Sequence, residues 1–309
     1  SRALLAGEYL RHQKDYQAYL KELSTAIDRK HGDYSQFWHN RNYVQFADRV
    51  KATVVFTHGS QDWNVKPINV YQMFRALPDS LEKHLFFHNG AHVYMNAWQS
   101  IDFRESMNAL ICQKLLGLEN GYTLPTLIWQ NNQSEQTWEV LDNFGHDNGK
   151  NIQLGEAEAS IANHYEEETF AKYGKTYQSF KDDLFADKAN AITLDFELDQ
   201  DIQINGRVHL ELKVKSNTNR GLISAQVLEM GDKKYLAPIP ALKRMNLDNG
   251  RLFKEEALRE LPFKQAKYRV ITKGHLNLQN RKDLLTIEDV TPNEWMTIGL
   301  DLQPTIYKL

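Results

Sequence analysis

The sequence contains little of what would mark a specialised class of protein. Among 309 residues there is one cysteine, Cys112, so no internal disulfide can form and a reducing, cytoplasmic setting is favoured. Lysine and arginine total 37 and aspartate and glutamate 40, with both signs interspersed, which excludes the basic surface of a dedicated nucleic-acid-binding protein. No apolar run approaches the roughly 18 residues that a membrane-spanning helix needs. We therefore expect neither nucleic acid nor a membrane as a partner.

The first residues also lack the signals of a chain start. The segment from Ser1 to Leu5 has no initiator methionine, no basic n-region and no cleavage site. We expect this sequence to be an internal piece of a longer protein. Its 309 residues, 41% of them apolar, are enough for about two domains with cores of their own.

Hydrophobic periodicity divides the chain into three zones. From Leu4 to about Lys30, apolar residues recur at spacings of three and four, which predicts a helix. Between Lys51 and Leu118, buried-strand and helix patterns alternate, as in a parallel α/β sheet. The expected elements are strands over Thr53–Thr57 and Leu85–Phe87, a helix from Pro67 to Leu77, and a helix over Phe103–Leu116 with an apolar face of Met107, Leu110, Ile111, Leu115 and Leu116.

The third zone, from Gly121 onward, is rich in short strands separated by turn signals, which favours a β-sandwich. The expected strands are Thr126–Trp129, Ala191–Leu198, Val208–Val214, Leu222–Leu228, Tyr268–Thr272 and Trp295–Leu302. Trp129 and Trp138 could form a sugar platform, but sandwich-core aromatics explain them more simply. The charged run from Lys254 to Glu260 is predicted to be the solvated face of a helix.

Two polar side chains follow the predicted parallel strands where such sheets collect their ligands and catalysts. Asp62 stands just past the first strand, and His92 stands in the equivalent place after a later one. On neighbouring strand ends, the carboxylate could fix the imidazole tautomer and leave the other ring nitrogen as a general base. Each residue also has a structural alternative, because aspartate is a common turn former and helix cap and a loop histidine is often structural.

An α/β-hydrolase would place its nucleophile before the acid and the histidine, on a Gly-x-Ser-x-Gly elbow. This sequence contains no such elbow. The nucleophile is therefore either outside this chain or absent. His146-Asp147 and His164–Glu168 contain ligand-type residues, but at no metal-binding spacing, so we expect no metal and no cofactor.

Several longer segments resemble the bacterial Xaa-Pro dipeptidyl-peptidases, of the serine peptidase family that includes cocaine esterase and glutaryl acylases. The segments that carry the resemblance are His58–Val65, Asn89–Met95 with Trp98–Phe103, Gly32–Tyr43, Gly274–Arg281 and Leu302–Tyr307. Together they extend the resemblance over the whole chain.

The resemblance implies a cytoplasmic, homodimeric serine exopeptidase that releases N-terminal dipeptides from peptides with proline second. It makes Asp62 the acid and His92 the general base of the catalytic triad. It places Trp63, Asn64 and Val65 at the border of the proline pocket, although simple loop packing explains them equally well. The serine would lie upstream, so we expect this piece alone to be inactive.

The implied architecture combines an α/β part with an all-β part. Residues 1–50 would be the remnant of a helical lid and its connection, 51–120 the C-terminal half of an α/β-hydrolase domain, and 121–309 a jelly-roll β-sandwich. Because chains of this family continue past Tyr307, the sandwich would be incomplete and the isolated piece prone to aggregation. A related esterase or acylase stays open as an alternative, as does a noncatalytic sandwich protein that binds carbohydrate or protein.

Overall fold

The chain forms two compact units, each described here by itself. The computed structural model describes residues 13–26, 34–96, 98–134, 137–145, 149–154, 158–161, 191–244 and 257–309. The first unit joins Ser1–His146 to Ile202–Leu309, and the second is Asp147–Asp201. The strand expected over Ala191–Leu198 is wrong, since no residue described in the second unit belongs to a strand. A strand needs a neighbour to pair its backbone groups, and the described part of this unit contains none.

The first unit begins with short helices. They are α2 (Gln13–Ala26), α3 (Gln36–His39) and the 3-10 helix η1 (Tyr43–Arg49). Helix α2 confirms the middle of the predicted helical zone, whose residues 1–12 and 27–33 lie outside the described ones. Its apolar stripe is not a core face of this unit, because Tyr16 and Tyr19 are 44% and 43% exposed.

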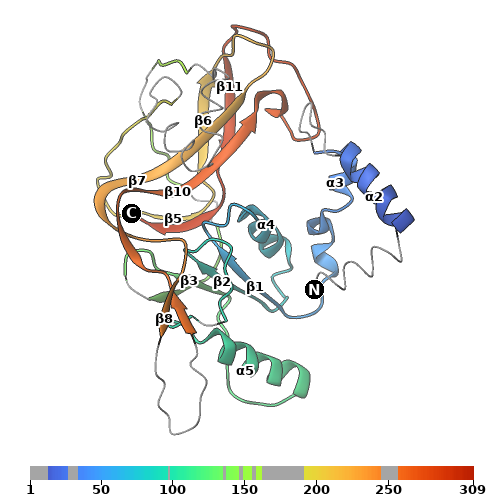
Figure 1. Ribbon diagram of the computed structural model, residues 1–309, viewed down its shortest axis with the longest axis vertical. Helices are drawn as coiled ribbons and strands as arrows, with labels where there is room; N and C mark the ends of the chain where they lie inside the picture. Colours follow the sequence, from blue (N-terminus) through green and yellow to red (C-terminus); the bar gives the residue numbers. More distant parts are fainter. Residues whose placement is uncertain are drawn as a thin grey trace. The chain divides into compact units, whose positions relative to one another are not determined.

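A four-stranded sheet follows, in the order β1-β2-β3-β4 (Figure 1). Its strands are β1 (Val54–Gly59), β2 (Lys83–His88), β3 (Leu127–Gln130) and β4 (Trp138–Leu141). The first three are parallel, and β4 runs antiparallel to β3. Helix α4 (Ile68–Ala76) connects β1 to β2, and α5 (Phe103–Leu116) connects β2 to β3. The predicted strand–helix alternation is therefore confirmed.

Strand β3 corrects one expectation. It forms where a strand was predicted, but it extends the parallel sheet beside β2 instead of belonging to a sandwich. All four of its residues are buried. Because both faces of β3 are covered, the uninterrupted apolar run Leu127–Trp129 suits this position in the parallel sheet.

Helix α5 has an aspartate cap at its start and a glycine at its end, but only some of its apolar side chains are buried. Asp102 accepts a hydrogen bond from the Glu105 backbone N–H at 3.0 Å, and Gly117 ends the helix at a φ of +64°. Leu110 is buried, whereas Leu115 is 77% exposed. Ile111 and Leu116 are also at least half exposed, so only part of the apolar residues on this helix face a core of the unit.

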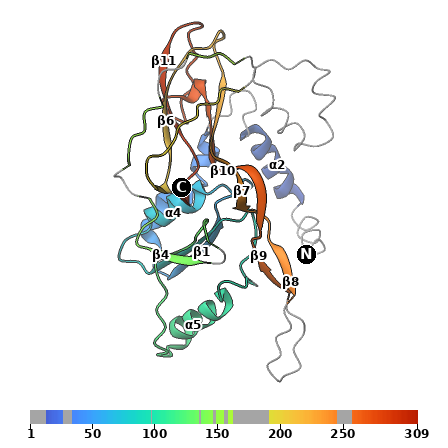
Figure 2. The ribbon, with the colours of Figure 1, turned by 90° about the vertical axis from the view of Figure 1, so that its left-hand side faces the viewer.

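The remaining strands form four antiparallel pairs. They are β5 (Gln203–Gly206) with β12 (Thr305–Lys308), β6 (His209–Val214) with β11 (Met296–Asp301), β7 (Leu222–Leu236) with β10 (Phe263–Asn277), and β8 (Ala241–Arg244) with β9 (Ala257–Glu260). A short 3-10 helix, η2 (Leu278–Asn280), follows β10. Figure 2 shows this β-rich part from the side. Four strands expected after residue 207 are confirmed. The helix face expected over Lys254–Glu260 is wrong for Ala257–Glu260, which form β9, and residues 254–256 lie outside the described ones.

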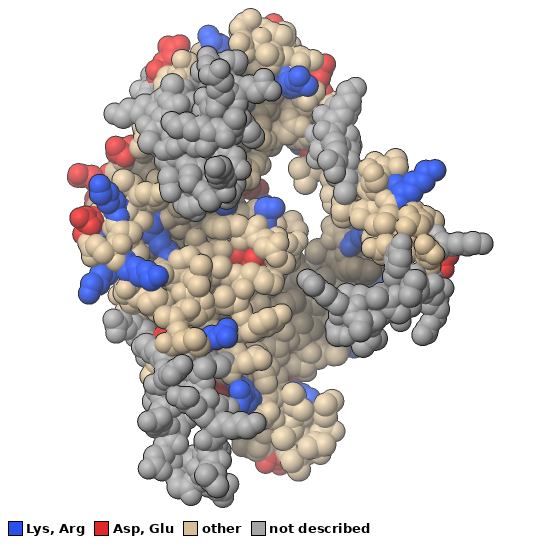
Figure 3. All heavy atoms as spheres, viewed as in Figure 1, with Lys and Arg blue, Asp and Glu red and all other residues tan. Residues whose placement is uncertain are grey.

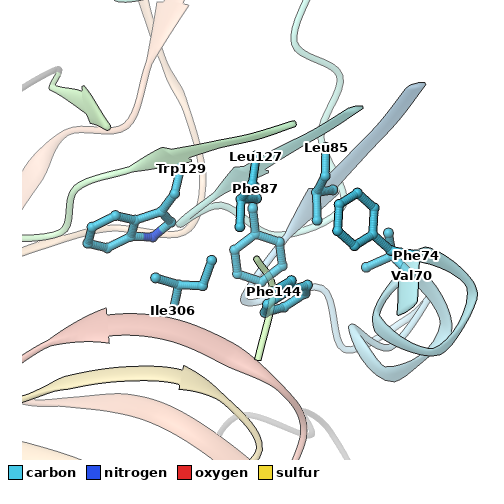
Figure 4. Packing of buried hydrophobic residues seen from close by; sticks show 8 residues of the cluster. All are labelled: Val70, Phe74, Leu85, Phe87, Leu127, Trp129, Phe144 and Ile306. Carbon is cyan, nitrogen blue, oxygen red and sulfur yellow. The ribbon is translucent and has the colours of Figure 1, made fainter. Parts of the chain in front are cut away.

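Two hydrophobic cores contain residues of both the α/β sheet and the β-rich part, and a third, around Leu278, Val290 and Ile298, lies within the β-rich part. Alternate residues of β2 face opposite sides, so Leu85 and Phe87 enter one core and Phe86 enters another. In the first core, Ile306 of β12 packs near the fully buried Trp129 (Figure 4). The second core includes Leu236 of β7, Leu261 and α5. Trp129 is therefore a core residue, and Trp138 packs partly buried against the second core. Trp138 also donates its indole N–H to Ser100 Oγ at 2.9 Å.

Candidate active site

The two loops that carry the predicted catalytic residues leave the sheet side by side. Strands β1 and β2 end in register, with Gly59 opposite His88. Hydrogen bonds continue past the strand ends, from Ser60 N to His88 O at 2.8 Å and from Gln61 N to Gly90 O at 3.1 Å. A Cβ atom on Gly59 would lie 2.2 Å from Gly90 O, so only glycine permits this approach.

The carboxylate of Asp62 is buried and its orientation is fixed. Its Oδ1 atom accepts hydrogen bonds from the backbone N–H groups of Asn64 and Val65 at 3.1 and 2.9 Å. Its Oδ2 atom lies 2.7 Å from His92 Nδ1. The Asp62 side chain is 5% exposed, so little water competes for this carboxylate.

His92 has the opposite exposure. Its side chain is 56% exposed, although Nδ1 is engaged by Asp62. The engaged nitrogen fixes the tautomer and leaves Nε2 as the atom that can exchange a proton with a reactant. The structure therefore brings together the acid and the histidine that the sequence singled out, in an arrangement capable of general base chemistry.

Two further histidines, His58 and His88, lie close to this pair and were not predicted as part of the site. His88 is buried, and its burial lowers its pKa to about 3. Its Nδ1 accepts a hydrogen bond from the Gly90 N–H at 3.0 Å. Burial also lowers the pKa of His58, with Asp62 opposing the shift. Both rings are therefore neutral near pH 7. The sequence signal that could have found them is their position at the ends of the two predicted strands that precede Asp62 and His92.

Trp63, Asn64 and Val65 follow the acid directly. The Asn64 and Val65 backbones hold the carboxylate, and the Val65 side chain is 43% exposed. Lys273 Nζ of β10 lies 4.2 Å from the centre of the Trp63 ring, a cation–π contact. These residues therefore lie beside the acid, and their predicted contact with substrate stays a prediction.

A hollow of about 440 Å³ lies at the other end of the sheet and contains none of the predicted site residues. It is lined at the amino-terminal ends of β2 and β3 by residues that include Glu82, His84 and Lys114. It is therefore separate from the loops that hold Asp62 and His92.

The described residues hold no group of three metal-ligating side chains. The ligand-type residues at 146–147 and 164–168 lie outside them. No helix among the described residues is long and apolar enough to cross a membrane. On the face drawn in Figure 3, basic and acidic side chains are interspersed and form no patch of one sign.

Two family patterns match the sequence. The pattern described as X-Pro dipeptidyl-peptidase (S15 family) matches residues 1–94, which include Asp62 and His92. The pattern described as X-Pro dipeptidyl-peptidase C-terminal non-catalytic domain matches residues 120–309. The two matches correspond to the end of the α/β part and to the β-rich part, with β3 and β4 falling in the second match.

Individual relatives agree with these matches. The chain is 94% identical over 309 residues to a Xaa-Pro dipeptidyl-peptidase of Streptococcus thermophilus, strain LMD-9, and spans 41% of that protein's length. It is 58% identical over 311 aligned residues to a Xaa-Pro dipeptidyl-peptidase of Streptococcus pneumoniae, strain Hungary19A-6, again spanning 41% of it.

Solved structures show the same fold at low sequence identity. An α-amino acid ester hydrolase superposes with a TM-score of 0.58 at 13% identity, covering 96% of this chain and 52% of its own. A CocE/NonD family hydrolase of Staphylococcus aureus superposes with a TM-score of 0.56 at 13% identity, covering 91% of this chain and 48% of its own.

Proposed function

The chain belongs to the family of X-Pro dipeptidyl-peptidases, and from this premise we propose that it supplies the acid and the histidine of a serine peptidase. The complete enzyme would release N-terminal Xaa-Pro dipeptides from peptides. The observation that carries the proposal is the 2.7 Å approach of Asp62 Oδ2 to His92 Nδ1 at the carboxyl ends of two parallel strands.

The burial of Asp62 distinguishes this pair from an ordinary surface pair, because the short distance alone is not specific to a catalytic site. His209 Nδ1 lies equally close, 2.7 Å, to Asp301 Oδ1 on the paired strands β6 and β11. There the Asp301 side chain is 42% exposed and also binds Arg207. The Asp62 carboxylate is buried, held by two backbone N–H groups and turned toward one exposed imidazole. Only this second arrangement fits a catalytic acid and base.

The proposed reaction is acyl transfer. The serine hydroxyl attacks the carbonyl carbon of the proline, and His92 Nε2 takes the serine proton and passes it to the leaving amine of the next residue. Water then hydrolyses the acyl-enzyme by the same route and releases the dipeptide. Asp62 stabilises the imidazolium that forms in each step. Since this sequence has no Gly-x-Ser-x-Gly elbow and spans 41% of its relatives, the serine would come from the rest of the enzyme. This chemistry needs no cofactor.

The finer features of the enzyme belong to the same proposal. Trp63, Asn64 and Val65 would border the substrate, because they are the residues that flank the acid. Residues 1–50 would complete a helical lid. Residues 51–120 together with β3 and β4 would form the end of the α/β-hydrolase domain, and the rest of 121–309 would form a jelly-roll sandwich. The enzyme would act as a cytoplasmic homodimer on peptides with proline second.

The test uses the full-length enzyme that contains this chain, assayed on a Gly-Pro chromogenic anilide. We expect Asp62→Asn and His92→Gln to lower kcat by about 10³- to 10⁴-fold. The control, His209→Gln, removes the imidazole of the exposed pair and should leave kcat unchanged. Equal losses in all three variants would contradict the assignment.

Labelling with a fluorophosphonate separates the alternatives. A parent enzyme that is labelled but inert on Xaa-Pro substrates would favour an esterase or acylase. A parent that is not labelled would favour a noncatalytic binding protein, in which Asp62 and His92 are dispensable.

A further inference from the structure

Strand β10 of the β-rich part touches both loops of the candidate active site. Figure 1 shows β7 and β10 as two long, curved strands above the β1–β4 sheet. The ladder between them shifts register between Val270 and Thr272, which leaves Ile271 as an extra residue. β-bulges of this kind are frequent next to active sites, where they redirect side chains and backbone groups.

The bulge supports the loop of the acid. The Gln61 side chain, which precedes Asp62 and is 7% exposed, donates from Nε2 to Val270 O at 3.0 Å and to Ile271 O at 3.4 Å. Because the register shift interrupts the ladder here, these carbonyls are available to a side chain. The acid loop is thereby attached to the bulge one residue before the catalytic carboxylate.

The residue just before the bulge supports the loop of the histidine. Arg269 is 7% exposed, and its Nη2 donates to Asn89 O at 3.1 Å. The backbone N–H of Asn89 donates to Gln130 Oε1 at 3.1 Å, and its Nδ2 donates to the Gln130 backbone O at 2.6 Å. Ala91 N donates to Pro238 O, which follows β7, at 2.7 Å. The three residues before His92 are therefore fixed from outside the loop.

Strand β9 holds the far side of the same loop. Gln99 N donates to Arg259 O at 3.0 Å, and Ser100 N donates to Glu260 Oε2 at 2.9 Å. Glu260 is 1% exposed and also accepts from Gln130 Nε2 at 3.3 Å. These hydrogen bonds connect the loop to β9, β10 and Gln130, so a displacement of β9 or β10 would be transmitted to the loop.

We propose that Arg269 and Gln61 are positioning residues that set the Asp62–His92 hydrogen bond through the bulge of β10. The inference rests on the function proposed above and extends it to a part of the chain whose family pattern is described as non-catalytic. Arg269 fixes the path of the histidine loop, and Gln61 fixes the path of the acid loop. Arg269 and the two residues whose carbonyls Gln61 binds, Val270 and Ile271, are consecutive in β10, so this one strand holds both loops at a fixed spacing.

The test measures turnover per active site in the full-length enzyme. Arg269→Met and Gln61→Met remove the hydrogen bonds at roughly constant volume, and Arg269→Lys keeps the charge if the first variant fails to fold. Fluorophosphonate labelling to completion counts the active sites. A displacement near 1 Å can cost about 100-fold in rate, so we expect kcat per labelled site to fall between about 10- and 100-fold with KM changed by less than about twofold.

The matched control is Arg281→Met. Arg281 lies in the same β-rich part and donates from Nη1 to Leu278 O at 2.9 Å and to Glu288 O at 2.7 Å, without contacting either loop through these bonds. It should lower the thermal midpoint and leave turnover per labelled site unchanged. Unchanged turnover in the Arg269 and Gln61 variants, or an equal loss in Arg281→Met, would overturn the proposal. If instead the parent is inert or His92→Gln stays active, the proposed function itself fails.

Discussion

Asp62 Oδ2 and His92 Nδ1 lie 2.7 Å apart. The loop that carries each residue is fixed by hydrogen bonds of its own, in addition to the contact between the two side chains. Asp62 is fixed by the two backbone N–H groups of its own turn, and His92 follows a tripeptide bound to β10, Gln130 and Pro238. Such preorganisation means that little reorganisation is needed when charge develops on the imidazole. It also means that the fold of the loops and the chemistry of the pair can be separated by mutation.

Two substitutions at Asp62 should make that separation. Asp62→Asn keeps an oxygen for the Asn64 and Val65 N–H groups but cannot offer a carboxylate to His92, so activity should fall while the unfolding midpoint changes little. Asp62→Ala loses the turn as well and should also destabilise the protein, by about 1–2 kcal/mol. Thermal unfolding and anilide hydrolysis on the same samples would check this. Equal destabilisation by both variants would contradict it.

A second prediction concerns the close approach of the two loops. A Cβ atom at Gly59 would lie 2.2 Å from Gly90 O and 2.6 Å from Ala91 O, both backbone atoms that cannot move aside easily. Gly59→Ala should therefore destabilise the protein by about 1–3 kcal/mol and lower activity as well. Gly149→Ala is the control, since among the described residues no atom beyond its chain neighbours lies within 4 Å of an added Cβ, and its φ is not in the left-handed region. Urea midpoints of the two variants should differ clearly; matching midpoints would refute the steric argument.

The sequence was sufficient to predict that Asp62 and His92 follow neighbouring strands and can lie within hydrogen-bond distance, because short buried strands and the polar residues after them can be recognised from local sequence. It did not distinguish β3 from a sandwich strand, since a short apolar run after a turn looks the same in both contexts. The supporting residues were beyond its reach for a different reason. Arg269 and Asn89 are 180 positions apart in the sequence. Arg269 precedes a β-bulge, and hydrophobic periodicity does not predict either the bulge or the burial of this arginine.

Glu260 illustrates the same limit and carries a third prediction. A charged run predicted a solvated face, but this carboxylate is buried and accepts from Ser100 N, Leu261 N and Gln130 Nε2. Glu260→Ala would leave three donors unpaired, two of them buried and Ser100 N partly buried, and should destabilise the protein by about 3 kcal/mol or more. Glu119→Ala, on an exposed residue after α5, should be neutral within about 0.5 kcal/mol. Similar thermal midpoints for the two variants would rule out the network.

The buried His88 predicts a loss of stability in mild acid. Burial lowers its pKa from 6.5 to about 3, so between those values the unfolded chain binds a proton that the folded chain does not. Stability is therefore fully retained above about pH 6.5 and falls as the pH drops toward 3, by up to about 1.4 kcal/mol per pH unit for one such group. His58, whose pKa burial also lowers, adds to the loss in the same direction.

The variant that isolates this contribution is His88→Gln, which removes the titrating ring while keeping an acceptor for the Gly90 N–H. Its stability at pH 7 should be lower than that of the parent, because a ring packed 4.8 Å from Trp98 is lost. Between pH 6.5 and 4.5, however, its urea midpoint should fall less steeply than the parent's. The informative quantity is how steeply the urea midpoint changes with pH. Lost packing lowers the midpoint by the same amount at every pH, whereas loss of the titrating ring changes the pH dependence. Parallel curves would mean that His88 does not stay neutral in the folded protein.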